Sequence, residues 1–494
     1  MKLYVGIDLG TSSVKLLLLD RDGNIRKTIS KDYPLIFPNP GWSEQDPAEW
    51  RDAVFSGLHE LLDGEDRSAV SGIGTGGQMH GLVILDENDA VIRNAILWND
   101  GRTEEETEWL NTAIGKETLS RYTGNIAFAG FTAPKLLWLK KREPENFARI
   151  RKIMLPKDYV TWLLTGVHAT DYSDASGMLL LDVKNKRWSS EMMEICGVTE
   201  SQLPSLFESS DAVGTIRPEI AKEFGLSEKT IVVAGAGDNA AAAVGTGTVG
   251  NGACNISLGT SGTLFISSDR FAVDEKNALH AFDHADGFFH LMGCMLSAAA
   301  CVKWFSENIL KTSDYQAEQD AISSDRLGRN RVFFLPYLMG ERSPINDTDA
   351  RGPFVGMSLD TTRADLYQAV LEGVSFALRD SLEVARAQGL TITQSKLCGG
   401  GAKSELWRKI LANVLDLTLE IPGTEEGPGY GAAMLAMTGC GEYSSVKKCC
   451  DALCKTVGTV SPDPEIVKRY EERYRLFREI YPAMKPLFKK LKEE

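Results

Sequence analysis

A six-residue loop motif occurs twice in this chain of 494 residues, and its two copies lie almost half a chain length apart. Ile-Asp-Leu-Gly-Thr-Ser occupies residues 7–12, and Ile-Ser-Leu-Gly-Thr-Ser occupies residues 256–261. Apolar residues flank both copies, which predicts a strand, a tight glycine turn and a returning strand in each. The repeat therefore predicts two related halves, since the chain is also too long for one ordinary core.

The two turns share a chemistry that suits phosphate, and they differ at one position. Each offers backbone N–H groups and small hydroxyl side chains, which allow phosphate oxygens to approach closely. The first copy carries Asp8, a hard oxygen ligand for Mg²⁺, where the second copy has Ser257. We therefore expect one loop to serve a metal ion and the other to serve a phosphate tail.

Composition narrows the class of protein. Hydrophobic residues make up 43% of the chain and charged residues 25%, as in folded globular proteins, and the net charge of −14 argues against non-specific nucleic-acid binding. No apolar run approaches the roughly 20 residues of a membrane span, and no signal peptide is evident, so we expect a cytoplasmic protein. The nine cysteines include no C-x-x-C pair, which indicates neither a disulfide framework nor a zinc site.

Strand-like and helix-like segments alternate along the chain, which predicts an α/β fold. In the first half we expect strands at 4–7, 14–19, 70–73, 82–85 and 230–234, and helices at 47–62, 104–113, 134–142 and 159–164. In the second half we expect helices at 296–309, 363–387 and 404–415, a strand at 397–398, and an amphipathic helix from residue 464. The glycine-rich stretch 245–252 predicts a hinge that divides domains 1–246 and 247–494.

Asp238 is the strongest candidate for a catalytic group. It lies in Gly-Ala-Gly-Asp-Asn-Ala at residues 235–240, directly after an expected strand. This run matches a dinucleotide fingerprint only superficially, because no Asp or Glu occurs from residue 239 to 268 to bind a ribose. A lone carboxylate between small residues suits a general base at a hydroxyl group, and a helix cap is the alternative.

Three further glycine-flanked segments carry candidate binding residues. Gln78, Met79 and His80 could form a hydrogen-bonding wall in one exposed turn, unless His80 is only a satisfied loop residue. Trp98, near Asp100 and Arg102, could hold a sugar on its aromatic face or belong to the core. The glycines at 399–401 follow a strand and open a helix, which indicates a nucleotide site or a plain turn.

Over essentially its full length, the chain resembles the FGGY family of carbohydrate kinases. The resemblance rests on motifs that occur in the family's order: residues 6–12, 42–46, 77–81, 96–102, 130–138, 155–159, 237–239, 257–262, 336–342, 352–357, 365–373 and 399–402. It implies an α/β fold of two ribonuclease H-like (actin-like ATPase) domains with an active-site cleft between them. The N-terminal domain is then expected to bind sugar and the C-terminal domain to bind nucleotide.

The resemblance also implies an activity, the phosphorylation of D-xylulose by ATP with Mg²⁺ to give D-xylulose 5-phosphate. The expected site residues fall into four groups. The catalytic residues are Asp238 and Asp8, and Asp8 is also the metal ligand. The sugar-binding residues are Gln78, Met79, His80, Trp98, Asp100, Arg102 and Asn239; the phosphate-binding residues are Thr11, Ser12, Lys15, Gly259, Thr260 and Ser261; and the adenosine-binding residues are Gly400, Gly401 and Ala402. Phosphorylation of another ketopentose or a polyol, such as ribulose or glycerol, is an alternative, and so is a non-catalytic actin-like sugar sensor. The sequence leaves the oligomeric state open, a homodimer included.

Overall fold

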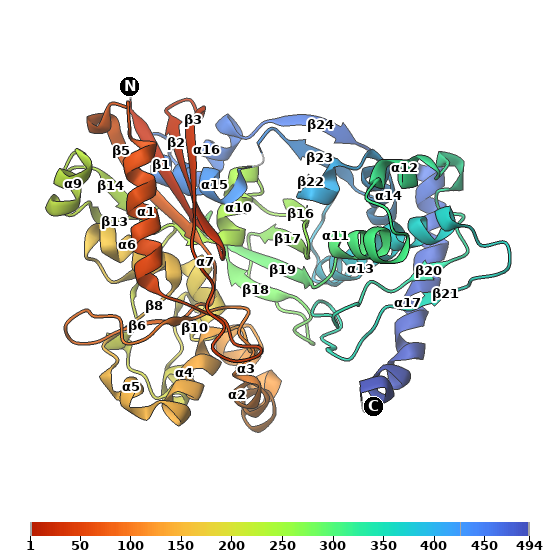
Figure 1. Cartoon of the computed structure of the whole chain (residues 1–494), viewed down its shortest axis with the longest axis horizontal. Coiled ribbons are helices and arrows are strands. Elements are labelled where there is room, and N and C mark those ends of the chain that lie inside the picture. The colour runs from red at the N-terminus through yellow and green to blue at the C-terminus, as the bar shows by residue number, and fades with distance from the viewer. Residues whose placement is uncertain (1, 425, 493–494) are drawn as a thin grey trace.

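The structure, a computed structural model, describes residues 2–424 and 426–492 and contains two lobes, each built on a seven-stranded sheet. The two sheets lie side by side in Figure 1, the first drawn mainly in red and the second in green and blue. The first sheet has the order β13-β14-β5-β1-β2-β3, with β15 beside the end of β5. Its strands are β1 (Leu3–Leu9), β2 (Ser13–Asp20), β3 (Ile25–Asp32), β5 (Val70–Gly77), β13 (Ala212–Thr215), β14 (Ile231–Val233) and β15 (Ala236–Gly237).

The second sheet repeats this plan. Its order is β18-β19-β17-β16-β22-β23-β24, and in each sheet an antiparallel hairpin (β1–β2 or β16–β17) continues through parallel strands to an antiparallel edge strand. Its strands are β16 (Cys254–Leu258), β17 (Gly262–Ser268), β18 (His280–Asp283), β19 (Phe289–Met295), β22 (Gln394–Cys398), β23 (Thr418–Pro422) and β24 (Thr456–Val460). The prediction of two related halves is therefore confirmed, and both Gly-Thr-Ser turns close the expected hairpins.

Long amphipathic helices cover the sheets, and their sequence periodicity located most of them well. Helix α1 (Pro47–Leu61) begins after Asp46, whose carboxylate accepts the backbone N–H of Ala48 at 2.9 Å. The expected helix at 363–387 is α13 (Arg363–Ala387), which begins at a capping box formed by Thr362 and Asp365. Three further helices match expectation closely, namely α6 (Pro156–Thr165), α14 (Glu405–Leu415) and the final α17 (Pro464–Lys492).

Two expected helices are irregular. The segment predicted as one helix at 104–113 forms α2 (Glu104–Trp109), which a π-helical stretch (Leu110–Gly115) joins to α3 (Lys116–Thr123). The segment predicted at 296–309 becomes helical only at α11 (Ala299–Lys303) and continues as a π-helix (Trp304–Ile309). The residues before α11 instead bond to distant groups: Leu296 donates its N–H to the Glu341 carboxylate at 2.8 Å, and Ala298 donates to the Thr260 carbonyl oxygen at 2.9 Å. Local periodicity does not encode such tertiary bonds.

The remaining elements are short or connect the sheets. The short strands are β4 (Glu44–Gln45), β6 (Val83–Leu85), β7 (Ala95–Ile96), β8 (Lys152–Met154), β9 (Ala169–Asp171), β10 (Leu181–Asp182), β11 (Arg187–Trp188), β12 (Ser205–Phe207), β20 (Phe333–Phe334) and β21 (Phe354–Val355). The helices are α4 (Thr132–Arg142), α5 (Pro144–Arg149), α7 (Tyr172–Ala175), α8 (Ser190–Cys196), α9 (Pro218–Phe224), α10 (Asp238–Thr246), α12 (Tyr315–Asp320), α15 (Gly427–Gly439) and α16 (Val446–Leu453).

Helix α15 lies far from the first lobe in sequence and packs against that lobe's sheet. It contacts β1, β5 and α10, and glycines bring the backbones together. A Cβ on Gly74 of β5 would lie 2.0 Å from the Ala432 carbonyl oxygen, and one on Gly431 would lie 1.9 Å from that of Ala241. Packing therefore does not follow chain order here, and the domain division between residues 246 and 247 stays a prediction.

Candidate active site

The protein holds the first Gly-Thr-Ser turn, at residues 10–12, by its carbonyl oxygens. Gln45 Nε2 donates to the Thr11 carbonyl oxygen at 2.6 Å, and the backbone N–H of Tyr33 donates to that of Ser12 at 3.2 Å. The Tyr33 hydroxyl donates to the Gly10 carbonyl oxygen. The turn is thus fixed from one side, while Ser12 stays exposed and Thr11 half-buried.

The second Gly-Thr-Ser turn, at residues 259–261, is held in the same manner by the start of α11. The Gly259 carbonyl oxygen accepts the N–H of Ala299 at 2.9 Å, and the Thr260 carbonyl oxygen accepts the N–H of Ala298 at 2.9 Å. The side chains of Thr260 and Ser261 are exposed. Both turns therefore combine a tethered backbone with accessible hydroxyl groups, the arrangement expected of a phosphate loop.

Asp8 and Asp238 flank the glycine end of the same strand. Asp8 on β1 pairs with Gly76 of β5, and Gly237 on β15 pairs with Gly77 on the opposite side of β5. Two strand spacings place the backbones of the two aspartates about 10 Å apart. The charge of Asp238 raises the pKa of Asp8, so the two carboxylates lie close enough to interact.

The surroundings of these carboxylates raise both pKa values. Burial and the nearby charge of Asp238 raise the pKa of Asp8 to about 7, although Lys15 opposes the shift. Burial also raises the pKa of Asp238 to about 6. Two hydrogen bonds oppose this shift, because the backbone N–H and Nδ2 of Asn239 donate to Asp238 Oδ1 at 2.7 and 2.8 Å. A carboxylate with such a pKa suits proton transfer near neutral pH.

Asp238 lies where the two lobes meet, at the start of α10. Gly237 occupies the N-cap position of this helix, so the alternative that Asp238 is itself the cap is wrong. Burial raises the pKa of the Cys294 thiol on β19, and the negative charge of Asp238 contributes to the same shift. The second sheet therefore comes close to this carboxylate.

Lys15 lies beside Asp8 in the hairpin register of β1 and β2. Its ammonium pairs with the Glu426 carboxylate at 2.8 Å, just before α15 begins. The sequence predicts Lys15 as a cofactor-binding residue but gives no sign of Glu426, because a single glutamate in a glycine-rich segment carries no recognisable pattern. Together Asp8, Lys15 and Glu426 form a charged cluster next to the first turn.

The turn that carries Gln78, Met79 and His80 is less exposed than the sequence analysis expects. Gln78 and Met79 are buried and His80 is half-buried, so the expectation of an exposed turn is wrong. Gln78 Nε2 donates to Gln45 Oε1 at 2.9 Å, and Gln78 N–H donates to the Leu9 carbonyl oxygen at 2.8 Å. Gln78 therefore braces the first Gly-Thr-Ser turn.

His80 and Met79 lie closer to the catalytic candidate. The His80 Nδ1–H donates to the Gly177 carbonyl oxygen at 2.8 Å, and the ring stacks on Phe131 at 4.6 Å. Burial and the positive charge of Lys135 lower the His80 pKa to about 3, so the ring is neutral and Nε2 is an acceptor. The Met79 side chain packs against Gly237, next to Asp238.

Trp98, Asp100 and Arg102 divide into one exposed side chain and one buried ion pair. The Trp98 side chain is 41% exposed, which excludes the core alternative, and its Nε1–H donates to Thr11 Oγ1 at 2.9 Å. Asp100 accepts from Arg102 Nε and Nη2 at 2.8 and 2.7 Å and from the Ser43 N–H at 2.6 Å. The polar atoms of Asp100 are thus already occupied by protein donors.

Arg102 is enclosed on every side. Its guanidinium lies 3.8 Å from the Trp42 ring centroid and 2.7 Å from the Glu44 carboxylate, and its side chain is fully buried. Because it is buried in this way, the ion pair of Asp100 and Arg102 anchors the segment 97–102, which carries the exposed Trp98.

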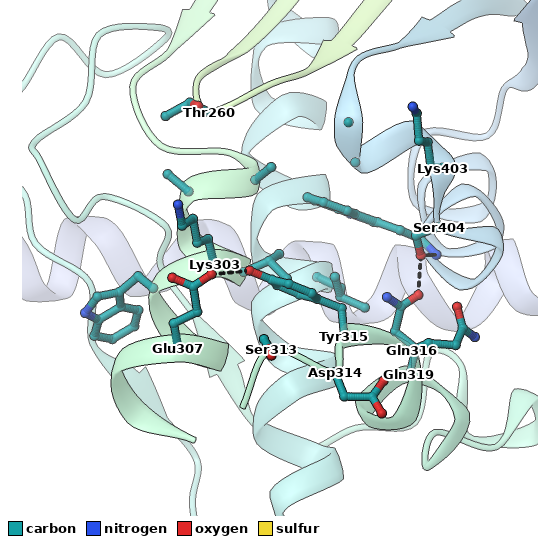
Figure 2. Close-up of a pocket in the computed structure, with 18 of the residues that line it drawn as sticks. Thr260, Lys303, Glu307, Ser313, Asp314, Tyr315, Gln316, Gln319, Lys403 and Ser404 are labelled. Atoms are coloured by element: carbon teal, nitrogen blue, oxygen red, sulfur yellow. Dashed lines mark hydrogen bonds between the residues drawn. The ribbon is translucent and has the colours of Figure 1, made fainter. Parts of the chain in front are cut away.

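A cavity of about 810 Å³ lies in the second lobe, between the second turn and the glycine run at 399–401. Figure 2 shows Thr260 at one end and Lys403 with Ser404 at another, and the Tyr315 side chain reaches across to Glu307. Tyr315 Oη donates to Glu307 Oε1 at 2.8 Å, and the Ser404 hydroxyl donates to Gln319 Oε1. Such a volume is in the range of pockets for nucleotide-sized ligands.

Of the three predicted adenosine-binding residues, two line this cavity and one does not. Gly400 and Gly401 line it, and a Cβ on Gly400 would meet no heavy atom within 4 Å. Ala402 is buried behind the wall, where its N–H donates to the Gly399 carbonyl oxygen at 3.1 Å. The sequence gives no sign of a role for Tyr315 and Glu307, because neither belongs to a recognisable motif.

Metal and membrane features are limited. Among the residues that the structure describes, no three His, Cys, Asp or Glu side chains converge as a metal site. Asp8 alone nevertheless fits Mg²⁺, which commonly takes one or two carboxylates and completes its shell with substrate phosphates and water.

Within the described part of the chain, no helix combines the length and apolarity needed to cross a membrane.

Comparisons with known proteins agree with the fold and with the paired loops. The N-terminal domain of the FGGY family of carbohydrate kinases matches residues 3–245, and its C-terminal domain matches residues 254–440. The chain therefore belongs to the FGGY family of carbohydrate kinases.

Three relatives illustrate the similarity. The xylulose kinase of Escherichia coli K12 is 40% identical over 98% of this chain and 100% of its own, and that of Bacillus subtilis is 37% identical over 100% and 99%. The crystal structure of a xyloylose kinase from Brucella ovis superimposes with a TM-score of 0.94 at 40% identity, covering 98% of this chain and 100% of that one.

Proposed function

We propose that this protein transfers the γ-phosphoryl group of ATP to the 5-hydroxyl of D-xylulose. The observation that carries the proposal is the placement of Asp238 at the junction of the lobes, with a raised pKa and a second carboxylate, Asp8, across the glycine end of β5. The xylulose kinases among its relatives support the choice of sugar.

In this proposal Asp238 is the general base. Its carboxylate accepts the proton of the 5-hydroxyl as that oxygen attacks the γ-phosphorus; the bond from phosphorus to the β,γ-bridging oxygen breaks, and ADP leaves. Asn239 holds Asp238 Oδ1 through two hydrogen bonds, which keeps the other oxygen available for the sugar. Positioning of the two substrates supplies most of the rate, because phosphoryl transfer needs little covalent help from the protein.

The nucleotide is assigned to the second lobe. The base and ribose occupy the cavity beside Gly400 and Gly401, and the phosphates extend past Thr260 and Ser261 toward the first turn. Asp8 would hold Mg²⁺ together with the phosphates, and the bound ion would offset their negative charge. Lys15 and Ser12 are assigned to the same phosphates from the first lobe.

The sugar is assigned to the first lobe, next to Asp238. Met79, the neutral His80 and the exposed face of Trp98 contact it, whereas Asp100 and Arg102 act indirectly by holding the surrounding loops. Gln78 Nε2 is held by Gln45, and Gln78 Oε1, which has no hydrogen-bond partner among the described residues, is left to accept from the sugar. This assignment is narrower than the sequence predicts, because the polar atoms of Asp100 and Arg102 bind protein groups.

An assay of ADP release tests the proposal. Purified protein with Mg-ATP is offered D-xylulose, D-ribulose and glycerol, and we expect D-xylulose to give the highest kcat/KM. Asp238→Ala should lower turnover by on the order of 10³ or more, while Asp22→Asn, on an exposed hairpin turn, serves as the matched control. Normal turnover in Asp238→Ala, or a preference for another acceptor, would reject the assignment.

A further inference from the structure

One hydrogen bond joins two elements that were assigned to different ligands. Trp98 borders the proposed sugar site, and Thr11 belongs to the first phosphate turn, yet Trp98 Nε1–H donates to Thr11 Oγ1 at 2.9 Å. The two residues are 87 positions apart in the chain. Their contact is thus a product of the fold and links the two halves of the proposed reaction.

The chemistry of the two groups fixes the direction of this bond. An indole N–H can only donate, so the Thr11 oxygen must accept, and the single hydroxyl proton of Thr11 is left to donate elsewhere. Inside the turn the carbonyl oxygens of Thr11 and Ser12 each already accept one hydrogen bond, from Gln45 and from Tyr33. The Thr11 proton is therefore available to an acceptor outside the turn.

A phosphate oxygen is the acceptor that this site offers. Phosphate groups only accept hydrogen bonds near neutral pH, and a hydroxyl with a fixed donor direction binds them better than one that rotates freely. Trp98 thus determines whether the Thr11 hydroxyl is ready to bind the transferred group.

The Trp98 ring is anchored at its backbone and open on its face. The buried Asp100 and Arg102 pair holds residues 97–102, and Gly130 packs so closely that a Cβ there would lie 2.3 Å from the Trp98 carbonyl oxygen. The side chain is 41% exposed, and its one polar atom is occupied by Thr11. A sugar can therefore contact the indole only through its face, which restricts the rotation of the ring and steadies the bond to Thr11.

We propose that Trp98 is a positioning residue that couples sugar binding to phosphoryl transfer by orienting the Thr11 hydroxyl toward the γ-phosphate. This inference rests on the proposed function, because it requires a sugar on the indole face and a phosphoryl group at the first turn. It assigns Trp98 a second role in addition to contact with the sugar.

Trp98→Phe separates the two roles, since phenylalanine keeps an aromatic face and lacks the N–H. We expect the KM for D-xylulose to change less than about threefold and kcat to fall roughly tenfold, which is less than the loss of a direct transition-state donor. Thr11→Val should lower kcat at least as much, and Thr11→Ser, which keeps the hydroxyl, should restore most of it. Trp109→Phe, at a similarly exposed tryptophan on α2, is the matched control and should be neutral.

A double-mutant cycle decides the inference. If Trp98 acts through Thr11, adding Trp98→Phe to Thr11→Val changes kcat by less than about twofold. Effects that multiply, or a Trp98→Phe variant that alters only the KM for D-xylulose, would overturn the coupling. Failure of the proposed function is seen separately, as a wild-type protein that phosphorylates none of the offered acceptors.

Discussion

The pH dependence of turnover offers a quantitative test of Asp238 as the base. Its pKa is raised from 3.8 to about 6, chiefly by burial. A base acts in its ionised form, so activity is present above this pKa and is lost as the pH falls through it. A carboxylate with a pKa of 6 is about 91% ionised at pH 7 and about 9% ionised at pH 5, which predicts a roughly tenfold loss of kcat/KM.

The expected loss separates this site from an ordinary aspartate. With a pKa of 3.8, the same group would still be about 94% ionised at pH 5, and the rate would hardly change. The assay is ADP release at subsaturating D-xylulose and saturating Mg-ATP, from pH 5 to pH 8.5. Saturating Mg²⁺ is needed because Asp8 has a pKa of about 7 without metal, and a bound cation keeps it ionised.

A variant beside Asp238 tests the cause of the shift. The Asn239 amide donates to Asp238 and lowers its pKa. Asn239→Ala should therefore move the acid limb of the pH profile, the fall in kcat/KM on the acid side, to higher pH. Asp238→Asn should leave a low residual rate without that limb. An acid limb centred near pH 4 in the wild type, or one that persists in Asp238→Asn, would refute the reasoning.

Two further predictions concern the nucleotide cavity and the buried ion pair. Gly400→Ala adds a methyl group that meets no protein atom within 4 Å. The melting temperature should therefore stay the same, while the KM for ATP rises about tenfold. Gly401→Ala should instead lower the melting temperature, because its Cβ would lie 2.7 Å from Trp407. Asp100→Ala leaves Arg102 buried with Glu44 alone and should cost about 3 kcal/mol of unfolding free energy in urea titration. A stability loss under 1 kcal/mol with a large rise in sugar KM would return Asp100 to direct sugar binding.

The sequence was informative about the fold wherever local pattern and tertiary structure agree. The repeated turns predicted two hairpins, and both were found because a Gly-Thr-Ser turn between apolar strands has few other conformations. Helix α15 escaped prediction, because its sequence Gly-Pro-Gly-Tyr-Gly-Ala-Ala-Met is apolar and small on all sides and shows no periodicity. Strand β3 escaped because it is polar and lies at a sheet edge.

The candidate site divides in a similar way. The positions of Asp8 and Asp238 followed from strands that end in glycine loops, which a sequence reader can recognise. The supporting residues Gln45, Tyr33 and Glu426 could not be predicted, because each acts on a turn that long-range register brings beside it. Asp100 and Arg102 looked like ligand-binding residues, because the sequence does not show that this local pair is buried against Trp42, Ser43 and Glu44.

The packing of α15 has a consequence for synthesis of the protein. Strand β1 is translated before the helix that covers it, which is encoded more than 400 positions later. The glycine-lined surface of the first sheet must therefore remain uncovered until α15 has left the ribosome. A nascent chain stalled before residue 427 should present that surface to chaperones, and one stalled after α15 has emerged should not.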